Sequence, residues 1–332
     1  MALTVRFHEY GGPEVLRLDE VDPGEPAAGE VLIRVDAIGV NRAEALFRAG
    51  QYIEQALELP ARLGAEAAGV VERLGPGVDG LEPGQAVSVV PAFSQNDYGV
   101  YAERAIVPAR ALLPRPSTVD AVTGAAVWMP YLTAYGAMAE VTGLRPGDVA
   151  VVTAASSGVG LAALHTAARL GATPIAVTRT RAKADRLLAE GAAEVVVSGE
   201  QDVAGRVLEL TGGRGAAAVF DAVAGPGVVD LARAVAAGGT LLLWGAQSGR
   251  PTPYPGFELG MPALNVRTFT VQEITRDADR LRRAAAYVAS GLRDGAFRAV
   301  VDRLFPLTEI AAAHRYLDSG ARFGKVVVTV RR

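Results

Sequence analysis

Apolar residues occupy every second position in parts of the first third of the chain. Val31, Ile33 and Val35 show this spacing, and a turn rich in Gly and Pro follows at residues 75–84. Alternation of this kind is typical of strands with one buried face, and frequent Gly and Pro divide such strands into short lengths. We therefore expect a small, mostly β barrel or sandwich that is interrupted by one helix near residues 43–49.

The pattern changes near residue 121, where alanine-rich helical sequence begins and runs to about residue 141. Beyond it, short apolar runs alternate with segments of helical period. The expected strands are 148–154, 174–178, 194–197, 216–221 and 240–245, and the expected helices are 159–170, 181–190, 203–211 and 228–236. Apolar strands that are separated by helices predict a parallel sheet with helices on both faces, which is an α/β fold of the doubly wound Rossmann type.

The last part of the chain returns to a mixed pattern. It predicts amphipathic helices at 279–290 and 307–317 and a closing strand at 325–330. Because the parallel sheet lies in the middle of the chain, we expect this segment to fold back onto the N-terminal domain. The predicted domains are residues 1–124 together with 268–332, and residues 125–267.

Composition narrows the possible functions. The 332 residues are 50% hydrophobic, enough for one large or two medium domains, and the net charge of −3 offers no basic surface for nucleic acid or anionic lipid. The chain has no cysteine, which excludes disulfides, thiolate metal sites and a cysteine nucleophile. Residues 1–10 predict a first strand and not a signal peptide, and Ser and Gly interrupt the longest uncharged stretch, so no membrane span and a cytoplasmic location are expected.

A candidate phosphate-binding turn, TAASSGVG, lies between the predicted strand 148–154 and the helix that follows it. A helix N-terminus offers free backbone N–H groups and a positive dipole end, and small residues let the backbone approach a pyrophosphate. An ordinary glycine-rich turn is the alternative, but the strand–helix units that follow favour nucleotide binding. The candidate residues are Ala155, Ser156, Ser157, Gly158, Val159 and Gly160.

The end of the second predicted strand indicates which dinucleotide is bound. An NAD site usually has an acid there for the ribose 2′-hydroxyl, but the first acid after this strand is Asp185. We assign Arg179 and Lys183 to the 2′-phosphate of NADPH and Thr178 to a supporting hydrogen bond. The alternative is that both cations are solvated charges at the start of a helix, where a positive charge is slightly unfavourable.

Six short motifs follow one another along nearly the whole chain: YGGPEVL from Tyr10, GVNR from Gly39, GAEAAGVV from Gly64, LTAY from Leu132, the AASSGVG turn, and GKVV from Gly324. In these motifs the chain resembles the zinc-free quinone oxidoreductase (zeta-crystallin-like) branch of the medium-chain dehydrogenase/reductase superfamily. The resemblance implies a GroES-like catalytic domain made from both chain ends, a central Rossmann domain, a cofactor between them, and a homodimer.

The resemblance also implies where the nicotinamide and the substrate bind. Zinc-dependent relatives carry a Cys near Asn41 and a His at the position of Ala65, so no metal is expected here. Asn41 and the Tyr52 region face the nicotinamide and the substrate in the family. The other implied cofactor contacts are Thr133, Gly245, Ala246, Phe269, Val271 and Lys325. One departure is Ser198, which stands where a Tyr often lies beside the adenosine.

The expected chemistry is hydride transfer to a small conjugated acceptor. Without zinc an unactivated carbonyl is not polarised, whereas a quinone or an α,β-unsaturated ketone spreads the charge that develops after hydride attack. Asn41, Tyr52 or water would stabilise the oxyanion, and Tyr52 and Tyr131 are candidate proton donors, with cleft-lining aromatics or proton supply from solvent as alternatives. Two other functions stay open: an enoyl or enone double-bond reductase of one pathway, and a non-catalytic NADPH-binding protein.

Overall fold

The structure is a computed structural model that describes residues 1–261 and 263–330. The chain forms two compact units. Unit 1 contains residues 1–129, 275–281 and 298 onward, and unit 2 contains residues 130–274 and 282–297. None of the helices in the described part of the chain combines the length and the apolar sequence that a membrane-spanning helix requires.

Unit 1 is mostly β structure. Its larger sheet has the order β15-β16-β3-β5-β6-β8, with β7 also paired to β3, and a smaller sheet has the order β2-β1-β4. The strands are β1 (Ala2–Phe7), β2 (Leu16–Val21), β3 (Glu30–Val40), β4 (Ala61–Arg62), β5 (Ala67–Leu74), β6 (Ala86–Val89), β7 (Arg104–Pro108), β8 (Leu112–Pro114), β15 (Val301–Pro306) and β16 (Lys325–Thr329). The helices are α1 (Arg42–Arg48), α2 (Ala121–Gly124) and α10 (Ile310–Asp318), with short 3-10 turns at Pro13–Val15, Ala109–Ala111 and Leu307–Glu309.

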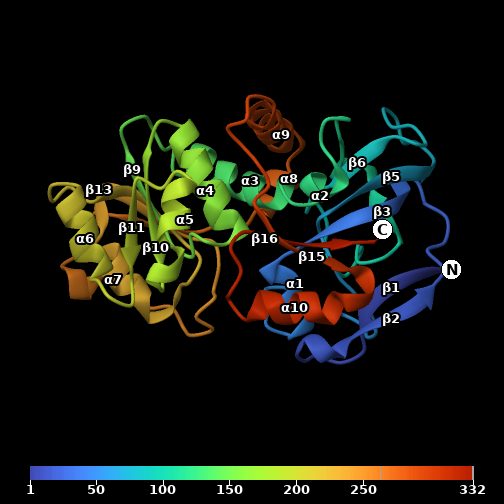
Figure 1. Cartoon of the computed structure of the whole chain (residues 1–332), viewed down its shortest axis with the longest axis horizontal. Coiled ribbons are helices and arrows are strands. Elements are labelled where there is room, and N and C mark those ends of the chain that lie inside the picture. Colours follow the sequence, from blue (N-terminus) through green and yellow to red (C-terminus); the bar gives the residue numbers. More distant parts are fainter. Residues whose placement is uncertain (262, 331–332) are drawn as a thin grey trace. The chain divides into compact units, whose positions relative to one another are not determined.

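Segments from the two ends of the chain meet in unit 1. Strand β16 runs antiparallel to β3, with Val326 opposite Val40 and Val327 opposite Gly39, so the red and blue strands lie side by side in Figure 1. Valines fill most of β16, and β-branched residues of this kind pack well on a pleated sheet. This pairing brings Lys325, the first residue of β16, to the end of β3 that leads into α1.

Unit 2 is built on a parallel sheet of the order β11-β10-β9-β12-β13-β14. The strands are β9 (Val149–Val152), β10 (Thr173–Thr178), β11 (Glu194–Val197), β12 (Ala216–Asp221), β13 (Val235–Leu243) and β14 (Asn265–Thr268). The helices are α3 (Trp128–Tyr135), which begins in unit 1, α4 (Gly158–Arg169), α5 (Ala184–Ala189), α6 (Val203–Leu210), α7 (Val228–Ala232), α8 (Gln272–Thr275), whose last residue belongs to unit 1, and α9 (Ala278–Arg293), whose first four residues do, with 3-10 turns at Arg181–Lys183, Gly225–Gly227 and Phe257–Leu259. Counted from β9, the strand order is that of the dinucleotide-binding Rossmann fold, as predicted.

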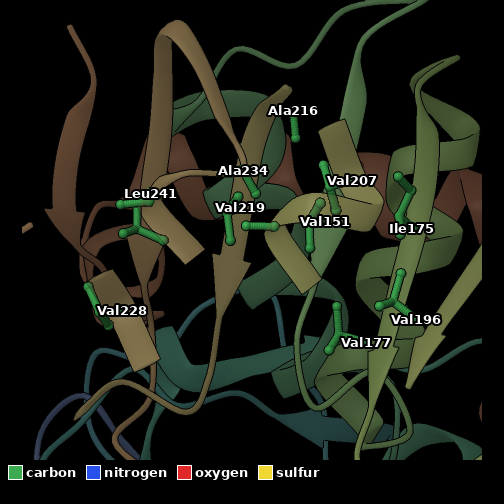
Figure 2. Packing of buried hydrophobic residues seen from close by; sticks show 12 residues of the cluster. Val151, Ile175, Val177, Val196, Val207, Ala216, Val219, Val228, Ala234 and Leu241 are labelled. Carbon is green, nitrogen blue, oxygen red and sulfur yellow. The ribbon is translucent and has the colours of Figure 1, made fainter. Parts of the chain in front are cut away.

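The core of unit 2 lies between the sheet and helices α6 and α7. Val151, Val219 and Leu241 from three neighbouring strands are buried there against Val207 and Val228 from the helices (Figure 2). Alternate strand residues point to opposite faces, so Ala150 and Val152 turn to the other face, and α4 contacts β9 and β10. The sheet is therefore covered on both faces, and its strand ends are left to form the site.

Two predicted elements differ from the structure. The helix expected at 228–236 ends at Ala232, because Val235 pairs with Ala216 and begins β13 five residues earlier than expected, across an irregular register. The helical run expected at 121–141 is divided into α2, α3 and a π-helix at Gly136–Val141. A Cβ at Gly136 would lie 2.5 Å from the Ile274 side chain and 2.8 Å from the Phe269 ring, so this segment packs too closely for a larger residue.

Candidate functional site

The turn after β9 has the geometry that a phosphate-binding turn requires. Ala154 adopts a positive φ of 46°, and Ser157 caps α4 by accepting a 3.0 Å hydrogen bond from the amide of Gly160. The first amides of a helix have no partner within the helix. The serine cap satisfies the amide of Gly160. In the described residues no partner is found for the amides of Gly158 and Val159, so these can bind an anion at the dipole end.

Gly160 shows that this turn is built for close packing. A Cβ on Gly160 would lie 2.5 Å from the carbonyl oxygen of Ala154 and 2.6 Å from that of Ala155. Both neighbours are backbone atoms, so a side chain at position 160 would force the turn and α4 apart. The residues present therefore fit a pyrophosphate-binding turn, which needs a glycine at this point for helix–strand packing.

A buried Thr–Asp pair joins the two central strands where the strand order reverses. Asp221, at the end of β12, is fully buried and accepts a 2.5 Å hydrogen bond from the hydroxyl of Thr153. Its carboxylate also accepts from the amides of Val223, at 3.1 Å, and Ala224, at 2.7 Å. In open α/β sheets ligands bind at this reversal point. The sequence reasoning missed this pair, although a polar residue at the end of each of two apolar strands signals it.

The structure brings one predicted cation to the turn. The amino group of Lys183 donates to the hydroxyl of Ser156 at 3.2 Å. Arg179 is exposed at the end of β10, next to buried Thr178, whose hydroxyl donates to the Thr180 carbonyl at 3.4 Å. Arg181 pairs with Glu200, so this neighbouring cation is occupied on the protein's own surface. The end of β10 therefore offers a positive charge beside the turn, and no acid occurs in residues 178–184.

The predicted contacts after β13 lie in a tightly packed segment. A Cβ on Gly245 would lie 2.7 Å from the Ala222 carbonyl oxygen, so the chain passes close to the end of β12, and Ala246 is exposed beside it. The ring of Phe269 is buried, and its amide donates to the Leu243 carbonyl at 2.9 Å. The amide of Phe269 thus forms a hydrogen bond with the last residue of β13. The carbonyl of Val271 accepts a hydrogen bond from the amide of Ile274 at 2.9 Å.

Asn41 lies at the centre of a hydrogen-bond network in unit 1. It precedes α1, and its amide donates to the carboxylate of Glu44 at 2.8 Å, which forms half of a capping box. Its side-chain oxygen accepts from the amino group of Lys325 at 2.5 Å. Its side-chain nitrogen faces three acceptors: the Gly39 carbonyl at 3.1 Å, Glu44 at 3.4 Å and Glu66 at 3.4 Å. The amide group that was predicted to contact the substrate is therefore engaged within the protein.

Lys325 and Glu66 form a buried ion pair with N–O distance 2.5 Å, and their side chains are 5% and 0% exposed. Glu66 also accepts from the amide of Met129 at 2.8 Å. A buried pair is stable only when hydrogen bonds satisfy the remaining atoms, as they do here. Lys325 takes part in this pair, and its role as a cofactor contact stays a prediction. Neither Glu66 nor Glu44 was singled out from the sequence.

Tyr52 is half-buried in the loop after α1, and in the described residues no hydrogen-bond partner of its hydroxyl is found. Burial raises the pKa of Tyr52 to about 12, and the nearby charges of Glu44 and Glu54 act in the same direction against Arg276. The phenol is therefore neutral and able to donate a hydrogen bond across the whole physiological range.

Tyr131 and Thr133 lie in unit 2 on α3 and are both buried. The hydroxyl of Tyr131 is 2.7 Å from Nδ1 of His165, whose Nε2 is 3.0 Å from Glu190. Its ring stacks on Phe297 with centroids 4.3 Å apart. These contacts give Tyr131 a packing role in unit 2, and its role as proton donor stays a prediction.

The described residues hold no group of three or more His, Asp or Glu side chains that could bind a metal ion. Ala65, at the position where zinc-dependent relatives carry a His, is buried, and its amide donates to Glu44 at 3.3 Å. The expectation that this chain uses no zinc rests on Ala65 and on the lack of cysteine in the sequence.

Comparisons with known proteins agree with the fold. Residues 27–117 match the alcohol dehydrogenase GroES-like domain, and residues 190–328 match the zinc-binding dehydrogenase family. The chain is 32% identical to a quinone oxidoreductase of Pseudomonas aeruginosa over 99% of both chains, and 30% identical to a 2-haloacrylate reductase of a Burkholderia species over 99% of both.

Solved structures of quinone oxidoreductases have the same fold as this chain. The crystal structure of Escherichia coli quinone oxidoreductase complexed with NADPH matches with a TM-score of 0.92 and 29% identity, covering 98% of this chain and 99% of that one. The GroES-like and Rossmann domains that the motifs predicted are thus confirmed. The chain belongs to the quinone oxidoreductase (zeta-crystallin-like) branch of the medium-chain dehydrogenase/reductase superfamily.

Proposed function

We propose that this chain is an NADPH-dependent reductase that transfers hydride to a quinone or another conjugated carbonyl acceptor. The observation that carries the proposal is the turn after β9, where Gly160 packs against backbone and Lys183 donates to Ser156. A cation in place of an acid beside this turn favours a 2′-phosphate over a 2′-hydroxyl. The family membership and the NADPH complex of the Escherichia coli relative support the same cofactor.

The cofactor would be held mainly by unit 2. Residues 155–160 would receive the pyrophosphate, and Thr178, Arg179 and Lys183 the adenosine end with its 2′-phosphate. When bound, NADPH supplies the hydride. Asn41, Thr133, Gly245, Ala246, Phe269, Val271 and Lys325 remain the proposed contacts of the nicotinamide end.

Tyr52 is the best-supported donor to the substrate oxygen. Its phenol is neutral, half-buried and without a hydrogen-bond partner in the described chain, whereas the side-chain nitrogen of Asn41 already faces three internal acceptors. A positioned neutral donor stabilises charge that develops on an oxygen in a site from which water is excluded. We therefore assign oxyanion stabilisation to Tyr52, and to Asn41 the task of holding Lys325 and α1 in place.

A conjugated acceptor suits these groups. The described residues offer no metal-binding cluster to polarise an isolated carbonyl, whereas conjugation already delocalises the charge that hydride attack creates. One relative is named a quinone oxidoreductase and another a 2-haloacrylate reductase, and quinones and haloacrylates both carry a C=C bond conjugated to a carbonyl group. Because a 2-haloacrylate reductase is among the relatives, a reductase dedicated to one conjugated C=C double bond is the alternative function.

NADPH fluorescence with and without acceptors tests this proposal. Binding should change the fluorescence, and addition of a quinone or an enone should then consume NADPH. Product analysis with one-ring quinones and with alkenones separates the two substrate classes. Binding without consumption over a broad panel of both classes would favour a non-catalytic NADPH-binding protein and overturn the proposed function.

We propose further that the protein works as a homodimer in the cytoplasm, where NADPH is available. Strand β14 is the last strand of its sheet: β13 pairs with one of its edges, and in the described residues no strand pairs with the other. Tyr254, Phe257 and Met261, in the segment before it, are 72%, 87% and 69% exposed. An uncovered strand edge beside exposed apolar side chains favours pairing with another chain. Light scattering during size-exclusion chromatography measures the mass directly, and a monomer at all concentrations would contradict the dimer.

A further inference from the structure

Two carboxyl groups and one amino group are buried together around Asn41. Glu44 and Glu66 are both 0% exposed, and Lys325 is 5% exposed. If both carboxyl groups were ionised, the cluster would hold two negative charges against one positive charge without water. An isolated buried charge is expensive, and a buried acid without a counter-charge takes up a proton instead.

The distances show which of the two acids lacks a counter-charge. Lys325 lies 2.5 Å from Glu66, and the Met129 amide also donates to Glu66, at 2.8 Å. Among the described residues, the donors found for Glu44 are neutral: its own backbone amide, the amide of Asn41 at 2.8 Å, that of Ala65 at 3.3 Å and the side-chain nitrogen of Asn41 at 3.4 Å. Glu66 is therefore the ionised partner of Lys325, and Glu44 is the acid that holds a proton.

The pKa of Glu44 agrees with this charge count. Burial raises it from 4.5 to about 7, and the charge of Lys325 and the hydrogen bonds from Asn41 only partly oppose the rise. The group therefore changes its charge within the physiological range, whereas an exposed glutamate is ionised throughout it.

The titratable groups around Glu44 in unit 1 come from four neighbouring segments. Lys325 faces it from β16, Glu66 from the residue before β5, Tyr52 from the loop after α1, and Tyr101 from the segment before β7. Ionised Glu44 raises the pKa of both tyrosines. Tyr101 is fully buried and hydrogen-bonded to His314, at 3.3 Å, so Tyr52 is the neighbour that can reach a ligand.

We propose that Glu44 is a positioning residue that controls Tyr52: the reductase works with Glu44 protonated and loses rate when Glu44 ionises. This inference rests on the proposed function. The negative charge that hydride transfer places on the substrate oxygen is stabilised by the Tyr52 phenol, which shares its proton with that oxygen. Ionised Glu44 holds the phenol proton more tightly and adds a second buried negative charge close to the first. Neutral Glu44 removes both effects.

The pH dependence of kcat/KM for NADPH-dependent reduction tests the proposal. With a group that titrates near pH 7, wild-type kcat/KM should fall about tenfold between about pH 6 and about pH 8. Glu44→Gln should flatten this profile, since glutamine keeps the acceptor of the capping box and does not titrate. Glu44→Asp restores a carboxyl group and should restore the decline. Glu20→Gln, which removes an exposed carboxylate on β2, is the matched control and should keep the wild-type profile.

Infrared pH-difference spectroscopy of the protein alone gives a readout that does not depend on turnover. The wild-type and Glu20→Gln proteins should lose a protonated-carboxyl C=O band as the pH rises through about 7, and Glu44→Gln should lack this band. A pH decline that persists in Glu44→Gln, or no titrating carboxyl band in the wild type, overturns the inference. Lack of turnover with every acceptor refutes the proposed function separately, and the infrared titration then still decides whether Glu44 holds the proton.

Discussion

The amino group of Lys325 lies 2.5 Å from the carboxylate of Glu66, although the two residues are separated by 259 positions in the chain. Strand β3 pairs with β16, which begins at Lys325, and with β5, which follows Glu66, so the two residues meet beside β3. Burial of both side chains makes each charge depend on the other. The pair places one positive and one negative charge in the buried interior beside Asn41, whose side-chain oxygen also accepts from Lys325.

Lys325→Met should destabilise the protein by about 3–5 kcal/mol, because it leaves the carboxylate of Glu66 buried without a counter-charge. The change in unfolding free energy in urea measures the loss. Lys325→Met combined with Glu66→Gln should recover much of it, since no uncompensated charge remains. Arg73→Met breaks an exposed pair with Glu25 and should cost less than about 1 kcal/mol. Equal losses for Lys325→Met and Arg73→Met would contradict the burial argument.

Gly160→Ala should destabilise unit 2 by about 1–3 kcal/mol and weaken NADPH binding, because its Cβ meets two carbonyl oxygens of the backbone. Thermal unfolding and a fluorescence titration with NADPH measure the two effects. Gly227→Ala is the matched control, since a Cβ at position 227 has no heavy atom within 4 Å. A Gly160→Ala protein that binds NADPH as tightly as the wild type would show that this turn does not hold the pyrophosphate.

Arg179→Ala should weaken NADPH by about tenfold to a hundredfold and NADH far less, because a hydrogen bond to a charged group contributes about 1.5–3 kcal/mol. Arg181→Ala provides the control two residues away, since Arg181 pairs with Glu200 and is not assigned to the cofactor. Dissociation constants for both cofactors give the comparison. Equal losses of NADPH and NADH affinity in Arg179→Ala would refute the assignment to the 2′-phosphate.

His314 should make the protein sensitive to acid. Burial, helped by the charge of Arg48, lowers the pKa of His314 from 6.5 to about 3. A base whose pKa is lowered by folding contributes stability above its unfolded pKa and loses it as the pH falls towards the folded pKa. Wild-type stability should therefore fall relative to His314→Gln between pH 6.5 and about 3, by at most about 5 kcal/mol. Unfolding curves over this window test it, with His8→Gln, at a more exposed histidine, as the control.

The sequence predicted the parts of the fold that depend on local pattern. Strands β11 and β12 begin and end where apolar runs predict them, and the turn at Ser157 and Gly160 was found because its residues are contiguous. The start of β13 was missed because Val235 and Ala236 suit a helix equally well, and only pairing with Ala216 makes them a strand. Local propensity does not encode such long-range pairing.

The cluster of Glu44, Glu66 and Lys325 around Asn41 was not predicted either, because it also depends on long-range strand pairing. Glu66 stands alone in the apolar run GAEAAGVV, which is a signal that a charge is to be buried, but its partner lies at the other end of the chain. Glu44 has the spacing of a capping box from Asn41, which predicts a helix start and not a shift in pKa. Only the meeting of β3, β5 and β16 turns these residues into one cluster.

The central claim is NADPH-dependent reduction of conjugated acceptors, and matched substrate pairs test it most directly. The rate of NADPH oxidation should be measured with cyclohexenone against cyclohexanone, and with benzoquinone against cyclohexanedione. We expect consumption with the conjugated member of at least one pair and none with either saturated ketone, and slower turnover with NADH. Equal rates for a conjugated acceptor and its saturated partner, or equal turnover with the two cofactors, would contradict the account.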